Sequence, residues 1–155
     1  ITSFYDSDNN VWKEGSIINP LDASGYDFIS EFMQSDPSLF EYILKARTNH
    51  VYDFKSTNGT GNKIQDIDVY RGMPIAINSD GITIYSSARD IGNMMAGYIA
   101  GSKGLTWRMA RMGFDAYQSI GGRGYEPEGT STQNAQLVGW KYGFMQYFKR
   151  RLSIL

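Results

Sequence analysis

The sequence predicts an α+β fold, a mainly helical single domain of about five helices with one β-hairpin near residues 73–86. Most apolar residues recur at the three- and four-residue spacing of an amphipathic helix. On both sides of Ser79-Asp80-Gly81 they alternate instead, and Asp-Gly between two alternating runs is a hairpin signal. A chain of 155 residues with 41% hydrophobic residues can bury the core of one domain.

Residues 1–21 are polar and rich in turn-forming residues, so we expect an extended N-terminal arm ahead of a folded core at 22–155. Phe4, Tyr5 and Trp12 would anchor this arm. The first helix of the core should begin at Asp22 or Ser24, and its apolar stripe consists of Phe28, Ile29, Phe32 and Met33.

A second helix is expected over 37–47, because Pro37 suits the first turn of a helix and Ser35 or Asp36 can cap it. Its buried face would be formed by Leu39, Phe40, Ile43 and Leu44. Residues 50–55 and 65–70 alternate and predict two short extended segments.

Three further helices are expected after the hairpin, at about 88–101, 105–117 and 133–150, with a glycine-rich loop at 119–132. The first has an apolar stripe of Ile91, Met94, Met95, Tyr98 and Ile99. The second presents Leu105, Met109, Met112 and Ala116 on one face. In the last helix the side chains expected to point inward are Leu137, Val138, Tyr142, Phe144, Met145 and Phe148.

The helix at 88–101 has a second, unusual face, on which Asp90, Asn93, Gly97 and Gly101 follow at spacings of three, four and four. A glycine inside a helix costs about 0.5–1 kcal/mol relative to alanine, so two on one face indicate that a backbone or a ligand comes close. Asp90 and Asn93 would then mark a functional site. The alternative is tight helix packing with Asp90 as the N-cap.

The composition excludes several kinds of site. Without cysteine there are no disulfides, thiol nucleophiles or cysteine-ligated metals, and His50 is the one histidine. We therefore expect no metal and no cofactor; the alternative is Mg²⁺ or Ca²⁺ held by Asp53, Asp90 and Glu128.

The net charge of −1 gives the chain no surplus of positive charge with which to bind nucleic acid. The sequence contains no run of about 18 apolar residues, the length that a membrane-spanning helix needs.

Carboxylates are the best candidates for chemistry, because glycoside hydrolysis needs only two of them across the scissile bond. The candidates are Asp53, Asp90, Glu126 and Glu128. If residues 50–55 form a strand, Asp53 and Lys55 lie on the same side of it. Arg123, in the run Gly121-Gly-Arg-Gly124, could help to bind an anion.

Three motifs occur in order: Tyr52-Asp-Phe-Lys55, then Asp90-Ile-Gly-Asn93 with Gly97, Gly101 and Gly104, then Gln118. This order resembles the bacterial polymorphic toxin type 44 domain, over about residues 25–145. Tyr52 stands where that family usually has Trp, and Glu126-Pro-Glu128 where it tends to have paired Asp residues.

The resemblance implies the C-terminal toxin domain of a secreted antibacterial effector. Such a domain is delivered into competing bacteria, here to the periplasm rather than the cytoplasm, and is neutralised by a cognate immunity protein. The N-terminus has neither a signal-peptide pattern nor an initiator methionine, so we expect a piece of a longer protein.

The main hypothesis is a hydrolase that cleaves peptidoglycan through the carboxyl groups of Asp90, Glu128 and Asp53. Its substrate-binding residues would be Asn93, Lys55, Gln118, Tyr52, Tyr125 and Arg123. The alternatives are a metal-independent RNase, with His50 or a carboxylate as the base and Lys55 on the phosphate, and a non-catalytic binding module. The hydrolase hypothesis predicts that one cleft is lined by Asp53, Lys55, Asp90, Asn93 and Gln118. The loop at 119–132 would lie at the rim of this cleft.

Overall fold

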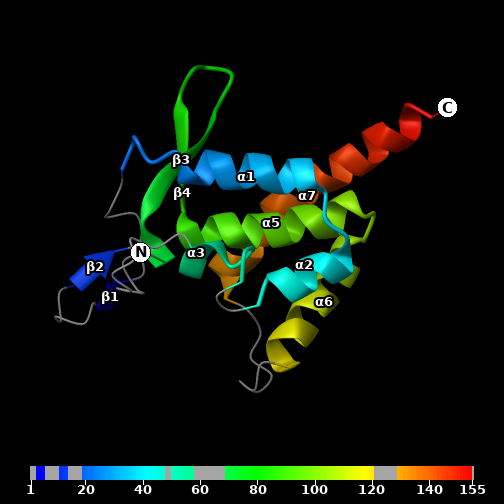
Figure 1. Ribbon diagram of the computed structural model, residues 1–155, viewed down its shortest axis with the longest axis horizontal. Coiled ribbons are helices and arrows are strands. Elements are labelled where there is room, and N and C mark those ends of the chain that lie inside the picture. Colours follow the sequence, from blue (N-terminus) through cyan, green and yellow to red (C-terminus); the bar gives the residue numbers. More distant parts are fainter. Residues whose placement is uncertain are drawn as a thin grey trace. The chain divides into compact units, whose positions relative to one another are not determined.

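The computed structural model describes residues 3–5, 11–13, 19–47, 50–57, 69–120 and 129–154, with the backbone alone at 3–5, 11–13 and 118–120. These residues contain six helices and two antiparallel strand pairs, which confirms the predicted α+β fold (Figure 1). The chain divides into two compact units, residues 1–92 and 93–155. The boundary falls inside α5 (Ala88–Ser102), so this helix contributes to both units.

Both strand pairs belong to the first unit. β1 (Ser3–Tyr5) pairs with β2 (Val11–Lys13), so part of the expected N-terminal arm is a short hairpin. β3 (Gly72–Ile77) pairs with β4 (Thr83–Ser87), which confirms the predicted hairpin. In Figure 1 these two strands form the long green hairpin.

The turn of the second hairpin is closed by one side chain. Asn78 Oδ1 accepts the N–H groups of Asp80 and Ile82, at 3.0 and 2.9 Å. Gly81 has a φ of 76°, a left-handed conformation that glycine adopts without steric cost. The Asp-Gly signal therefore has a direct structural basis.

α1 (Ser24–Ser35) packs against β3. The helix begins where it was expected, and Asp22 Oδ1 accepts the Ser24 N–H at 3.0 Å. Gly25 permits the close approach, because a Cβ at this position would lie 3.0 Å from the Pro74 carbonyl oxygen. Phe32, on the same helix, is fully buried in the core.

α2 (Leu39–Lys45) is shorter than the helix predicted over 37–47. Asp36 adopts left-handed backbone, with a φ of 40°, and ends α1. The predicted caps are wrong, since it is Ser38 whose Oγ accepts the Glu41 N–H, at 3.1 Å. Pro37 therefore lies buried in the connection and not in the first turn of α2.

Aromatic rings attach α2 to the rest of the first unit. The predicted buried face of this helix is wrong, because Phe40 is 73% exposed and Ile43 and Leu44 are also exposed. Tyr42 instead stacks on Tyr52 with ring centroids 5.9 Å apart, and both rings meet Phe32 edge-on.

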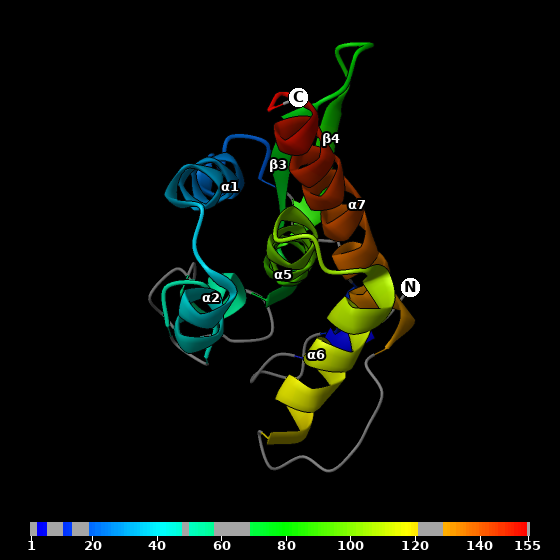
Figure 2. The same cartoon turned by 90° about the vertical axis from the view of Figure 1, so that its right-hand side faces the viewer.

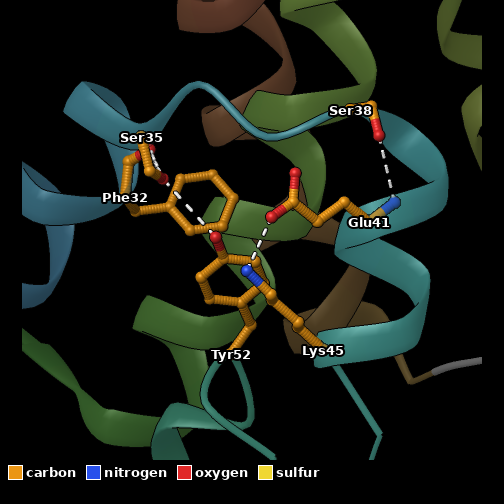
Figure 3. Close-up of polar contacts among 6 residues, drawn as sticks. All are labelled: Phe32, Ser35, Ser38, Glu41, Lys45 and Tyr52. Atoms are coloured by element: carbon orange, nitrogen blue, oxygen red, sulfur yellow. Dashed lines mark hydrogen bonds and ion pairs between the residues drawn. The ribbon is translucent and has the colours of Figure 1, made fainter.

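Polar contacts reinforce this aromatic cluster (Figure 3). The Tyr52 hydroxyl lies 3.4 Å from Ser35 Oγ. Lys45 Nζ lies 5.6 Å from the centre of the Tyr52 ring and forms an ion pair with Glu41 at 2.6 Å. Tyr52 is thus held by contacts from both α1 and α2.

The strand predicted at 50–55 is wrong. α3 (Phe54–Thr57) is a single helical turn, in which the Asp53 carbonyl oxygen accepts the N–H groups of Ser56 and Thr57, both at 3.0 Å. Phe54 is 3% exposed and packs on Phe28, with ring centroids 4.4 Å apart. Of the segment predicted to be extended at 65–70, residues 69 and 70 are helical, and the others lie outside the described residues.

In the second unit, α5 and α7 (Thr130–Leu152) pack backbone against backbone (Figure 2). A Cβ at Gly97 would overlap the Gln136 carbonyl oxygen, and one at Gly101 would overlap the Trp140 carbonyl oxygen. The approach is reciprocal. A Cβ at Gly139 or Gly143 on α7 would overlap the carbonyl oxygen of Met94 or Tyr98 on α5, so glycine is required on both helices.

α6 (Trp107–Ile120) joins this pair through polar contacts. Arg111 donates to Gln136 Oε1 at 2.6 Å and to Asp115 Oδ1 at 2.5 Å. The Trp140 indole N–H donates to the Leu105 carbonyl oxygen at 2.8 Å. On the predicted face of α6, Met109 and Met112 are exposed.

The orientation predicted for α7 is wrong. Val138, Tyr142, Met145 and Phe148 were expected inside, but they are 59%, 50%, 55% and 51% exposed. The buried positions of this helix are instead small or polar: Thr132, Ala135, Gln136, Gly139 and Gly143. The backbone contact with α5 leaves no room for large side chains on that side. By contrast, the stripe predicted on α5 is buried at Ile91, Met95, Tyr98 and Ile99.

The Gly139→Ala substitution should lower the free energy of unfolding by about 3 kcal/mol, because its methyl group must displace the backbone of α5. Urea denaturation at 25 °C measures this loss.

Gly113→Ala on α6 is the matched control, since a Cβ there would meet nothing within 4 Å. This substitution should raise the free energy of unfolding by about 0.5–1 kcal/mol. Equal effects at the two positions would contradict the backbone contact.

Candidate functional site

The candidate site is built on the first turn of α5. The Asp90 N–H donates to Ser87 Oγ at 3.1 Å, and the Ala88 N–H donates to the Arg71 carbonyl oxygen at 3.1 Å. Ser87 is therefore the capping residue, and Asp90 is the third residue of the helix and not its N-cap. The Ser-x-x-Asp spacing of a capping box was present in the sequence and could have identified Ser87.

The carboxyl group of Asp90 is unusual. Its Oδ1 atom is buried and has no hydrogen-bond partner in the part of the chain that the structure describes. Burial raises the pKa of this carboxyl above its ordinary value, against the smaller opposing effects of the Ser87 hydroxyl and the Arg89 charge. An acid that retains its proton to a higher pH is suited to general acid catalysis.

A second buried carboxyl group lies on an adjacent segment. Asp53 is 8% exposed and directly precedes α3. α3 meets α5 where Phe54 faces Gly92: a Cβ at Gly92 would lie 4.0 Å from the Phe54 Cβ. The fold therefore brings the Asp53 and Asp90 segments together from positions far apart in the sequence, within the first unit.

Two arginines lie beside the start of α5. Arg89 lies over the Tyr70 ring, with its guanidinium carbon 5.9 Å from the ring centre. Arg71 forms an ion pair with Asp22 at 3.5 Å. Neither Arg89 nor Tyr70 was predicted as a site residue, because their contact joins segments that no sequence motif connects.

Lys55 does not share a side with Asp53. In a strand they would point the same way, but in the helical turn of α3 residues two apart point in very different directions. Accordingly, Asp53 is buried, whereas Lys55 and His50 are exposed. Tyr52 was predicted to stack on a sugar ring, but its ring is already packed against Tyr42 and Phe32.

The other predicted residues are only partly described. Asn93 follows Asp90 by three residues in α5 and is partly buried. Gln118 lies in α6, but its side chain is outside the described part of the structure. Arg123, Tyr125, Glu126 and Glu128 also lie outside the described residues. Of the cleft predicted from the sequence, the structure brings together the Asp53 and Asp90 segments.

The glycine face of α5 has a structural explanation. Gly97 and Gly101 are covered by the backbone of α7, so they are not open to a ligand. The predicted face therefore divides into two parts, with a carboxyl group in the first turn and a packing surface further along the helix.

Among the described residues, no group of three or more His, Asp or Glu side chains is arranged to hold a metal ion. No described helix is long and apolar enough to cross a membrane. Comparison of the chain with family models, curated proteins and solved structures gave no match. The resemblance to the type 44 toxin domain therefore stays a prediction.

Asp90→Asn should change the pH dependence of stability. Because the folded pKa of Asp90 is raised above 3.8, the native protein loses stability as the pH rises from 3.8 through that folded pKa. The Asn variant lacks this loss. Its free energy of unfolding, measured by urea denaturation at a series of pH values, should therefore rise relative to that of the wild type across this window.

Asp22→Asn should show the opposite sign. Burial acts to raise the pKa of Asp22, but hydrogen bonds from Ser24 and the charge of Arg71 together outweigh it and lower this pKa below 3.8. Its carboxylate stabilises the fold above pH 3.8, and this stabilisation is lost as the pH falls through the folded pKa. The same pH trend in both variants would refute burial as the cause at Asp90.

Proposed function

We propose that this chain is a hydrolase domain that acts on the peptidoglycan of the bacterial cell envelope, with Asp90 as its general acid. The observation that carries the proposal is the partly buried Asp90 carboxyl group, with its raised pKa and an Oδ1 atom that has no hydrogen-bond partner among the described residues. Burial is the usual means by which an enzyme keeps a carboxyl group protonated near neutral pH.

In the proposed reaction, Asp90 donates its proton to the glycosidic oxygen as the bond from that oxygen to the anomeric carbon breaks. The Asp53 carboxylate accepts a proton from a water molecule, and the hydroxyl of this water forms the new bond to the anomeric carbon. Two carboxyl groups thus supply the acid and the base, and the buried position of Asp53 supports its assignment as the partner. Glu128 is the other candidate for this second function.

The type 44 resemblance supports a biological setting for this chemistry. The chain would be the toxin domain of a secreted antibacterial effector, delivered through a secretion system into the periplasm of a competing cell. A cognate immunity protein would protect the producing cell in interbacterial competition.

An RNase is less well supported than a peptidoglycan hydrolase. Its expected base and phosphate-binding residues, His50 and Lys55, are exposed side chains, whereas Asp53 is buried. A non-catalytic module would explain the glycine face of α5 but leaves the Asp90 Oδ1 atom, which has no hydrogen-bond partner among the described residues, without a function.

Production of the chain in two compartments separates these alternatives. A peptidoglycan hydrolase should kill bacteria only when it is exported to the periplasm, with rounding and lysis of the cells. Growth arrest from the cytoplasm with loss of RNA would refute the hydrolase and support the RNase. Absence of toxicity in both compartments would support the non-catalytic module.

Asp90→Asn should slow the release of new reducing ends from purified peptidoglycan by at least about 100-fold, because a general acid typically contributes 10²–10⁴ to the rate. In the wild type, this rate should fall as the pH rises through the folded pKa of Asp90. Asp53→Asn should cause a loss of similar size.

Asp80→Asn is the control, because this residue lies in the exposed turn of the hairpin. It should leave the rate unchanged. Matching circular dichroism spectra and unfolding curves would show that every variant is folded, and full activity of folded Asp90→Asn would end the assignment.

A further inference from the structure

α7 carries a row of large exposed apolar side chains, which we call the outer face: Val138, Tyr142, Met145, Phe148 and Leu152. They are 59%, 50%, 55%, 51% and 68% exposed. Most of the row lies on the side away from α5, and the Tyr142 ring at its edge lies 6.1 Å from the Tyr98 ring of α5. At about 1.5 Å per residue the row is about 21 Å long. Large side chains in this number are unusual on a free surface and indicate an interaction site.

The charge of α7 has one sign. Its sequence contains Lys141, Lys149, Arg150 and Arg151 and no Asp or Glu. All four cations are exposed. The helix dipole accounts for cations in the last turn, but not for Lys141 in the middle of the helix. Lys149 falls in line with the apolar row, between Met145 and Leu152, so apolar and cationic groups share this face.

The width of the outer face indicates what it fits. At 3.6 residues per turn, Tyr142 and Phe148 lie about 120° apart around the helix axis. This arc is broader than the narrow seam of a two-helix coiled coil. Within the arc, a protein partner would have to place an acid opposite Lys149. The headgroup layer of a bilayer instead offers phosphate and acyl chain at nearly the same depth.

We infer that the outer face of α7 lies on the surface of an anionic membrane. The apolar side chains enter the boundary between headgroups and acyl chains, and Lys141 and Lys149, which fall within the apolar arc, contact lipid phosphates. Lysine and arginine can do this beside apolar residues, because their long stems carry the charge up to the headgroups.

Two further groups of exposed apolar side chains, on α2 and on the β3–β4 hairpin, lack this match of charge. On α2, the exposed Phe40, Ile43 and Leu44 share the helix with the ion pair of Glu41 and Lys45. On the β3–β4 hairpin, Ile77, Ile82 and Ile84 are accompanied by Asp80. The α2 patch therefore provides a control of similar apolarity without a surplus of positive charge.

Co-sedimentation of the folded chain with lipid vesicles tests this inference. The chain should bind vesicles of phosphatidylglycerol and phosphatidylcholine in equal parts, more weakly as salt rises, and should not bind vesicles of phosphatidylcholine alone. The double variant Lys141→Gln, Lys149→Gln should lose at least about tenfold in affinity. Met145→Ser with Leu152→Ser should lose a similar factor.

Phe40→Ser with Ile43→Ser on α2 should leave vesicle binding unchanged, with unfolding curves as the check on folding of each variant. Three results would overturn the inference: equal binding to both kinds of vesicle, binding that the Gln variant retains, or no binding to either kind. The last would assign the outer face to an acidic protein. Vesicle binding is measured without peptidoglycan, so this outcome is independent of the proposed hydrolase activity.

Discussion

The contact between the backbones of α5 and α7 is the constraint on which the second unit depends. Glycines on both helices remove the side chains that would otherwise hold the two backbones apart. Because that side of α7 accepts only small or polar residues, its large apolar side chains are placed on the outside. The same contact fixes the C-terminal part of α5, the helix whose first turn carries Asp90.

Patterns that depend on local spacing were enough to predict the β3–β4 hairpin and every described helix except α3, but they did not predict the β1–β2 pair. The Asp-Gly turn located the β3–β4 hairpin, and the apolar stripe of α5 is buried at most of its positions. The buried faces of α2 and α7 could not be predicted this way, because the pattern rule places the largest apolar residues inside. α2 is held by Tyr42 and Tyr52 instead, and α7 by glycines.

The part of the candidate site that lies within a single helix was predictable. Asp90 was identified from its place at the start of a helical face, although Ser87 and not Asp90 is the cap. Lys55 was misplaced because a helical turn replaces the expected strand. The approach of Asp53 to α5 was expected from the hypothesis of a single cleft. Its physical basis, the contact of Phe54 with Gly92 across a long separation in the sequence, could not be predicted.

The outward apolar residues of α7 also bear on how the stability of this chain should be understood. A partner that covers this face binds the folded state, because the unfolded chain does not present these residues in one row. Its binding free energy then adds to the stability of the fold by mass action. A melting temperature measured in dilute buffer thus describes the uncovered protein alone, and any surface that covers α7 should raise it in proportion to the logarithm of the concentration of that surface.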